Sequence, residues 1–341
     1  RSPGSPSPCA PHASPARVKS RERIRGQCVI ERDLDMAEFH GASNATYVLN
    51  DGLLQIQRNE RVGGAGYASF TQTGGTHEVW GNLTLGAGAG SQGRYAIRGG
   101  TLDVADGILA VGWDGEGTLR LGGGAVIADE LNIHPSRGTL LSEPGSTNLQ
   151  VNRLSGLPAT FDLNGWLLLG HAGGSGVGSF TLAPGQSLEV DGLEVGYEAS
   201  ATFDDHGGSL TAISLGVGVW SSISGQYTMD SPNSQLHVNW ETVGAMGNGT
   251  FAQHDGEHVV TDWLIVGNGP GTGQFNLAGG TLGTGAVVVG GAPASIAIAT
   301  AATPRTRGCK ASTASAPNGR YPSTLTTTSK RVTWLGHGAP R

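Results

Sequence analysis

The middle of this chain contains no lysine and no cysteine. Residues 41–300 carry 7 basic side chains, all of them arginine, against 22 acidic ones, a net charge of −15. Such a surface repels nucleic acid, so we expect neither DNA nor RNA as a partner. The three cysteines, Cys9, Cys28 and Cys309, lie outside this region. No run of about 18 apolar residues offers a membrane-spanning helix.

The sequence also lacks the apolar spacing of an amphipathic helix. Its 58 glycines do not recur at every third position, which excludes a collagen triple helix. Apolar residues instead alternate with polar ones, as in Leu188–Val195, where Glu189 and Glu194 separate apolar neighbours. Alternation predicts short β-strands. Glycine pairs such as Gly74-Gly75 would provide the turns, since glycine adopts a positive φ without steric cost.

One pattern recurs about eleven times between residues 46 and 290. Each copy has an aromatic residue or leucine, a turn, a short apolar strand and then an apolar residue followed by glycine. The first position is occupied by Tyr47, Phe70, Tyr95, Leu119, Leu140, Phe161, Phe180, Phe203, Tyr227, Phe251 and Phe275, at intervals of 19 to 25 residues. We place the apolar-glycine pair at Leu85-Gly86, Val111-Gly112, Leu169-Gly170, Val195-Gly196, Leu215-Gly216, Val243-Gly244, Val266-Gly267 and Val289-Gly290. A fixed period of this length is typical of stacked repeats.

These repeats predict an all-β fold, a right-handed parallel β-helix (β-solenoid) of about eleven rungs with three short strands in each rung. Short strands bury little alone, so each repeat must stack in register on its neighbours. We assign the solenoid to residues 46–291. Residues 1–45 form a low-complexity N-terminal flank and residues 292–341 a basic C-terminal flank, and both are expected to be disordered. The acid-free C-terminal flank also has the composition that an out-of-frame reading of the gene would give.

Segments such as Ser179–Gly196 and Gln274–Gly290 resemble the glycine-rich strand repeats of bacterial autotransporter passengers and of large exported bacterial surface proteins. The resemblance covers about residues 46–290. It implies a stalk, adhesin or display scaffold outside the cell, at the outer surface of a bacterium. A host surface or a polysaccharide would be its ligand, and the chain would be part of a longer passenger. No secretory signal is visible near residue 1, so this localisation rests on the resemblance.

One candidate metal site comes from aligning the repeats. His206, Asp230 and His254 occupy equivalent positions in consecutive rungs, three residues after the aromatic. Two imidazoles flanking a carboxylate could bind a divalent metal or act as an acid/base pair. The alternative is a solvated polar face, because rungs about 4.8 Å apart separate the two histidines by about 10 Å. That is too far for one zinc ion, so we expect no metal site.

One candidate carbohydrate site is formed by tryptophans. Trp166, Trp240 and Trp263 each lie three residues before the apolar residue of the apolar-glycine pair. Trp240 and Trp263 belong to adjacent rungs, which predicts that they share one outer face. Exposed indoles can bind sugar rings against their flat apolar surfaces. The alternative is that they cover a corner of the coil or pack against a flank.

The function expected from these patterns is structural or adhesive, with no catalytic residue and no cofactor. The alternative is a carbohydrate-binding or polysaccharide-cleaving β-helix of the pectate-lyase type. That cleavage uses carboxylate-bound calcium and a basic residue. The arginines of the repeats all lie N-terminal to the acidic cluster of Asp204, Asp205 and Asp230, and fold analogy alone confers no activity.

Overall fold

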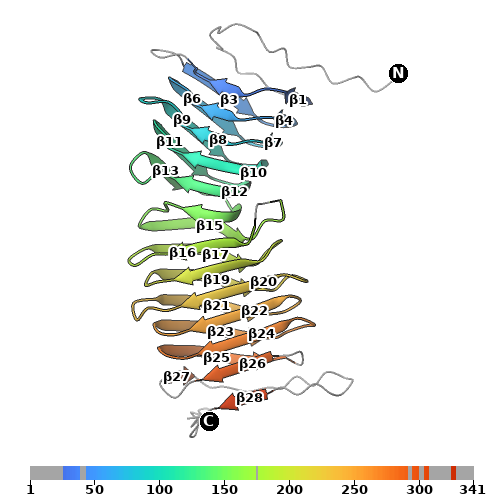
Figure 1. The fold of residues 1–341 in the computed structure, drawn as a ribbon, viewed down its shortest axis with the longest axis vertical. Coiled ribbons are helices and arrows are strands. Elements are labelled where there is room, and N and C mark those ends of the chain that lie inside the picture. The colour runs from blue at the N-terminus through green and yellow to red at the C-terminus, as the bar shows by residue number, and fades with distance from the viewer. Residues whose placement is uncertain are drawn as a thin grey trace, which may run out of the picture. The chain divides into compact units, whose positions relative to one another are not determined.

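A computed structural model describes residues 26–38, 44–173, 176–290 and 294–298, and the backbone of residues 303–306 and 324–327. These residues form β-strands and their connections (Figure 1). Parallel strands stack turn upon turn into a β-solenoid of about eleven turns, which confirms the predicted fold class. Within the described residues, no helix is long and apolar enough to cross a membrane. Most of the two predicted flanks lies outside the described residues.

The chain divides into two compact units. The first contains the described residues up to Pro158, together with Leu163–Gly165 and Gly173. The second contains Ala159–Asp162, Trp166–Ala172 and the described residues from Gly176 onward. β15 (Thr160–Leu169) contributes residues to both.

The first strand of each turn in the first unit belongs to a five-stranded parallel sheet. This sheet contains β3 (Asn44–Leu49), β6 (Tyr67–Gln72), β9 (Gln92–Ile97), β11 (Glu116–Leu121) and β13 (Gly138–Ser142). The other strands are β1 (Gln27–Ile30), β2 (Leu34–Met36), β4 (Leu53–Ile56), β5 (Glu60–Val62), β7 (Thr76–Val79), β8 (Leu83–Leu85), β10 (Thr101–Val111), β12 (Gly124–Ile133) and β14 (Thr147–Ser155). The turns that begin with β3 and β6 have the three predicted strands. From β10 onward the second and third are one strand, because β10 pairs first with β7 and then with β8.

Each turn of the second unit alternates a short strand with a longer one. The short strands are β16 (Gly178–Leu182), β18 (Ala201–Asp205), β20 (Ser224–Met229), β22 (Asn248–Gln253), β24 (Thr272–Leu277) and β26 (Ala294–Ile298). The longer strands are β17 (Ser187–Val195), β19 (Ser209–Val217), β21 (Gln235–Val243), β23 (Glu257–Val266) and β25 (Thr281–Val289). Two strands of four residues each follow: β27 (Thr303–Thr306), which pairs with β25, and β28 (Thr324–Thr327), which pairs with β26. Strands two apart in the chain pair in parallel, as β20 does with β22 and β21 with β23.

Ten of the eleven predicted aromatic-or-leucine positions are in register within their unit, and Phe161 on β15 is buried. In the first unit the order along the sheet is Tyr47, Phe70, Tyr95, Leu119 and Leu140. In the second unit it is Phe180, Phe203, Tyr227, Phe251 and Phe275. Neighbouring ring centroids lie 4.6–5.1 Å apart. Each of these two inward series is called an aromatic column.

One apolar-glycine pair in our prediction is wrong by two residues. Val217, not Leu215, pairs with Val195. Gly218, not Gly216, makes the turn, with a φ of +62° and with its N–H donating to the carbonyl of Val195. The sequence contains two apolar-glycine pairs in a row here, so its pattern fits both registers. The backbone hydrogen bonds decide between them.

Strands also extend beyond both predicted ends of the solenoid. β1 pairs in parallel with β4, and β2 with β5. At the other end β26 pairs with β24 and places Ile296 opposite Phe275. None of these added strands has an aromatic residue at the repeat position. The pattern that defines the repeat therefore does not reach them, although their backbones continue the ladders.

Candidate functional site

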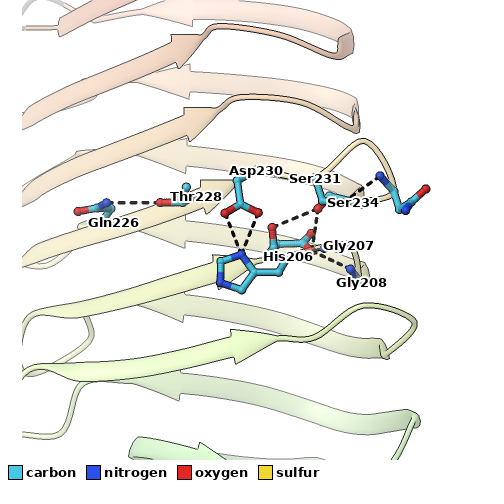
Figure 2. A network of polar contacts seen from close by, with 10 residues as sticks. His206, Gly207, Gly208, Gln226, Thr228, Asp230, Ser231 and Ser234 are labelled. Carbon is cyan, nitrogen blue, oxygen red and sulfur yellow. Dashed lines mark hydrogen bonds and ion pairs between the residues drawn. The ribbon is translucent and has the colours of Figure 1, made fainter.

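A network of polar side chains lies where β18 and β20 end (Figure 2). His206 and Asp230 follow these strands at equivalent positions in successive turns. His206 Nδ1 lies 2.8 Å from both carboxylate oxygens of Asp230, and Figure 2 shows the two side chains pointing toward each other. The side chains are 46% and 41% exposed. The hydrogen bond to Asp230 is the main cause that raises the pKa of His206, so the imidazolium form is favoured.

Asp205 is the buried member of this network. Its Oδ1 accepts hydrogen bonds from the N–H groups of Gly207 and Gly208, at 3.0 and 2.8 Å, and from the hydroxyl of Ser234, at 2.9 Å. Its Oδ2 is buried without a hydrogen-bond partner. Desolvation outweighs the three hydrogen bonds and raises the pKa of Asp205. The carboxyl group thus holds the bend that follows β18, through Gly207 and Gly208, and links it to the next turn through Ser234.

The third predicted metal ligand does not join the pair. His254 follows β22 at the equivalent position, and its backbone N–H donates to the carbonyl of Met229. In the described part of the chain, no group of three or more His, Cys, Asp and Glu side chains could hold a metal ion. His206 and Asp230 therefore form a two-residue link across adjacent turns.

The structure brings two of the three candidate tryptophans together. Trp240 on β21 and Trp263 on β23 are paired in register, with side chains 47% and 39% exposed. In the same register Ser214 lies on one side of the pair and Ala286 on the other. Because both flanking side chains are small, the two indoles stand out from the outer surface.

Trp166 packs differently from the other two. It is only partly exposed, and its indole lies over Gly192 on β17. A Cβ at Gly192 would collide with Cε3, Cζ3 and Cδ2 of the indole. Gly192 pairs with Ser214 and so belongs to the same register as Trp240 and Trp263. Trp166 thus covers backbone at this corner rather than presenting an open ring face.

Sequence reasoning missed a buried polar cluster in the first unit. His77 Nε2 lies 2.8 Å from Glu60 Oε2, and neither side chain has exposed surface. The atoms are close enough for an ion pair, although they are not aligned as a hydrogen bond. The imidazole stacks on Phe70 and Tyr95, with centroid distances of 4.7 and 5.9 Å. The Tyr95 hydroxyl lies 2.9 Å from His77 Nδ1 and donates to Gln72 Oε1 at 2.7 Å.

The second unit contains the same cluster at the same sequence spacing, formed by Glu241, Gln253 and His258. His258 Nε2 lies 2.7 Å from Glu241 Oε2, and both side chains are fully buried. Gln253 Nε2 donates to two backbone carbonyls, as its counterpart does in the first unit. The aromatic partner differs, because Phe275 stands where the first unit has Tyr95. As a result His258 Nδ1 and Gln253 Oε1 have no hydrogen-bond partner.

A sequence signal for these clusters does exist. His77 alternates in phase with Val79, and His258 with Val260, so both histidines occupy inward positions of a strand. Each histidine follows a glutamine by 5 residues and a glutamate by 17. Burying a charged group without a partner is costly, so an inward histidine implies a buried partner.

Glu194 on β17 is a further carboxyl group with a shifted pKa. It packs over Gly216 of β19, where a Cβ would collide with its carboxylate. Its Oε2 is buried without a hydrogen-bond partner. Desolvation raises the pKa of Glu194 to about 7. The shift follows from the packing of this carboxyl group between two turns.

These sites and the fold carry the functional argument by themselves. Comparison of the chain with known protein families, with curated proteins and with solved structures finds no match. The described residues offer a set of repeated turns, two buried Glu-His contacts, one surface His-Asp link and one exposed pair of indoles.

Proposed function

We propose that this chain is a non-catalytic structural or adhesive scaffold at the outer surface of a bacterium, of the autotransporter-passenger type. The observation that carries the proposal is the aromatic column of the second unit. Five rings follow one another there through successive turns, at centroid distances of 4.6–5.1 Å. The inward side chains of such a column stabilise the stacking of successive turns, since each repeat is stabilised by its neighbours. The outer faces are left to meet other molecules.

Charge and sequence pattern support the same proposal. The 22 acidic side chains of residues 41–300, against 7 basic ones, keep such surfaces soluble and limit nonspecific association. The titratable groups also have structural roles. Glu60 and His77 pair with each other inside the core, and His206 and Asp230 pair on the surface. The resemblance of Ser179–Gly196 to passenger repeats supports export as part of a longer chain.

Protease treatment of intact cells tests surface display. Cells of the bacterium that encodes the chain are treated with protease and then probed with an antibody raised against residues 176–290. We expect the antibody signal to disappear while a cytoplasmic control protein survives. Protection of the signal until the cells are lysed would contradict the proposal.

An assay of sugar release tests the non-catalytic part. The purified chain is incubated with pectin and with alginate, with and without calcium, and unsaturated products are measured. We expect none. Product release that Asp230→Asn abolishes would instead establish the polysaccharide-cleaving alternative.

Carbohydrate binding is a second candidate function, and a specific observation favours it. Trp240 and Trp263 are exposed side by side on adjacent strands, where the core does not require them. Large exposed aromatic side chains at adjacent positions mark binding surfaces more often than single ones do.

A further inference from the structure

We propose that the outer corner formed by Asn239, Trp240, Thr261, Asp262 and Trp263, here called the indole corner, binds a neutral polysaccharide. The inference specifies the ligand of the adhesive scaffold proposed above and rests on that function, because a scaffold displayed on the cell surface is exposed to polysaccharides outside the cell. Three properties of the corner carry it: its apolar surface, its polar groups and its charge.

The apolar surface is a pair of neighbouring ring systems. Trp240 and Trp263 are opposite each other on β21 and β23 and expose 47% and 39% of their side chains. Strands in a sheet lie about 4.8 Å apart, so the two indoles offer one extended patch along the direction in which turns stack. The C–H faces of sugar rings pack on such aromatic surfaces. Two rings in a row suit a chain of sugars better than a single one.

The polar groups lie immediately beside the indoles. Asn239 precedes Trp240, and a β-bulge in β23 places both Thr261 and Asp262 before Trp263. The Thr261 hydroxyl donates to Asn239 Oδ1 at 3.1 Å, which engages the amide oxygen and leaves the amide N–H groups as donors for a ligand. The exposed Asp262 carboxylate accepts hydrogen bonds. Donors and acceptors next to an apolar face match the alternating hydroxyl and C–H edges of a sugar.

Charge decides which polysaccharides fit. Residues 159–290 contain 12 acidic side chains and no lysine or arginine. An anionic polysaccharide would find no cation here and would be repelled by the surrounding carboxylates, including Asp262. A neutral polysaccharide carries no such penalty. Pectin and alginate, which are anionic, are therefore disfavoured as ligands of this corner.

The first unit provides a matched control. Trp80 and Trp113 are each 57% exposed, more than either indole of the corner. Trp80 follows β7 and Trp113 lies beyond β10, so the two occupy different corners. All seven arginines of the repeats also lie in this half of the chain. Trp80→Ala with Trp113→Ala therefore removes two exposed indoles without touching the indole corner.

Affinity gel electrophoresis tests the proposal. The chain is run in native gels that contain a neutral polysaccharide, hydroxyethyl cellulose or galactomannan, or an anionic one, alginate or polygalacturonate. We expect retardation in at least one neutral gel and none in the anionic gels. Trp240→Ala with Trp263→Ala should weaken the apparent affinity about tenfold or more, which corresponds to about 1.4 kcal/mol. The Trp80→Ala and Trp113→Ala control should run as the unsubstituted chain does.

Three results would overturn the proposal: no retardation in either neutral gel, stronger retardation in an anionic gel, or equal retardation of the Trp240→Ala and Trp263→Ala variant. Circular dichroism confirms beforehand that this variant keeps its β-structure. A negative result would leave surface display intact, because protease treatment of whole cells tests that separately. If the chain on intact cells resists protease but the purified chain still binds the neutral polysaccharide, surface display would be contradicted and the indole corner would stand.

Discussion

Replacing Phe275 with tyrosine should stabilise the second unit. The ring of Phe275 lies 5.9 Å from that of His258, the same distance that separates Tyr95 from His77 in the first unit. The Tyr95 hydroxyl contacts both His77 Nδ1 and the glutamine of its cluster. A hydroxyl at position 275 would meet the corresponding atoms, His258 Nδ1 and Gln253 Oε1. Both are buried and lack a hydrogen-bond partner.

The expected gain follows from two new hydrogen bonds. Each net hydrogen bond contributes about 1 kcal/mol, and each unsatisfied buried polar group costs about 1–3 kcal/mol. Making room for the oxygen costs about 1 kcal/mol or more in a packed core. We therefore expect Phe275→Tyr to stabilise its unit by about 1–2 kcal/mol. The reverse change, Tyr95→Phe, creates two unsatisfied groups and should destabilise the first unit by about 2–4 kcal/mol.

Hydrogen exchange read by mass spectrometry measures these effects locally. Repeat proteins need not unfold as one cooperative unit, so a single melting temperature would mix the two units. Peptides from β23 report on the second unit and peptides from β7 on the first. For Phe275→Tyr we expect exchange in β23 to slow by about 5–30-fold and exchange in β7 to stay the same. Tyr95→Phe should speed exchange in β7 alone.

Unchanged or faster exchange in β23 of Phe275→Tyr would show that the hydroxyl does not satisfy the two buried atoms. Gln253→Met provides a double-mutant control. In that background one acceptor is missing, so Phe275→Tyr should stabilise by a smaller amount. An equal gain in stability with and without Gln253 would show that the effect does not come from a hydrogen bond between the new hydroxyl and Gln253.

Glu194→Gln should raise the free energy of unfolding by up to about 3 kcal/mol above about pH 7 and have little effect near pH 4. Folding raises the pKa of Glu194 from 4.5 to about 7, so the folded state binds the proton more tightly than the unfolded state does. The free energy of unfolding therefore falls as the pH rises between these two values. Urea titrations at both pH values measure this, and an effect independent of pH would contradict it. Asp230→Asn should lower the pKa of His206 in an NMR titration, because the carboxylate raises it; an unchanged pKa would refute that cause. Gly192→Leu should speed hydrogen exchange in peptides from β17, since its side chain needs the space of the Trp166 indole; unchanged exchange would show that the indole can move.

Much of the fold could be predicted from periodicity. Tyr47, Phe70 and Tyr95 recur at nearly constant intervals, and parallel in-register pairing turns equal intervals into a column. The joining of the second and third strands in β10 could not be predicted, because the backbone stays extended across the register shift between Val104 and Ile108. The choice between Leu215 and Val217 depended on backbone hydrogen bonds, which leave no trace in a sequence that fits both registers.

The candidate sites were predictable where position alone matters. Equivalent places in the repeat brought His206 beside Asp230 and Trp240 beside Trp263. The pairing of Glu60 with His77 could not be read in this way, because the residues lie in different strands of different turns and meet only inside the coil. The binding role of the indole corner stays a prediction.

Cysteine cross-linking tests the in-register stacking most directly. Thr250 on β22 and Gln274 on β24 are paired, and both alternate with buried neighbours and so face outward. Paired strands lie about 4.8 Å apart, within the Cα separation of about 4.4–6.8 Å that a disulfide requires. Asn276 lies two residues further along, at about 8 Å from Thr250, which is too far.

The test is made in a chain whose native cysteines are replaced by serine. Thr250→Cys with Gln274→Cys should form a disulfide on mild oxidation, whereas Thr250→Cys with Asn276→Cys should not. Equal cross-linking of both pairs, or of neither, would contradict the in-register stacking of successive turns.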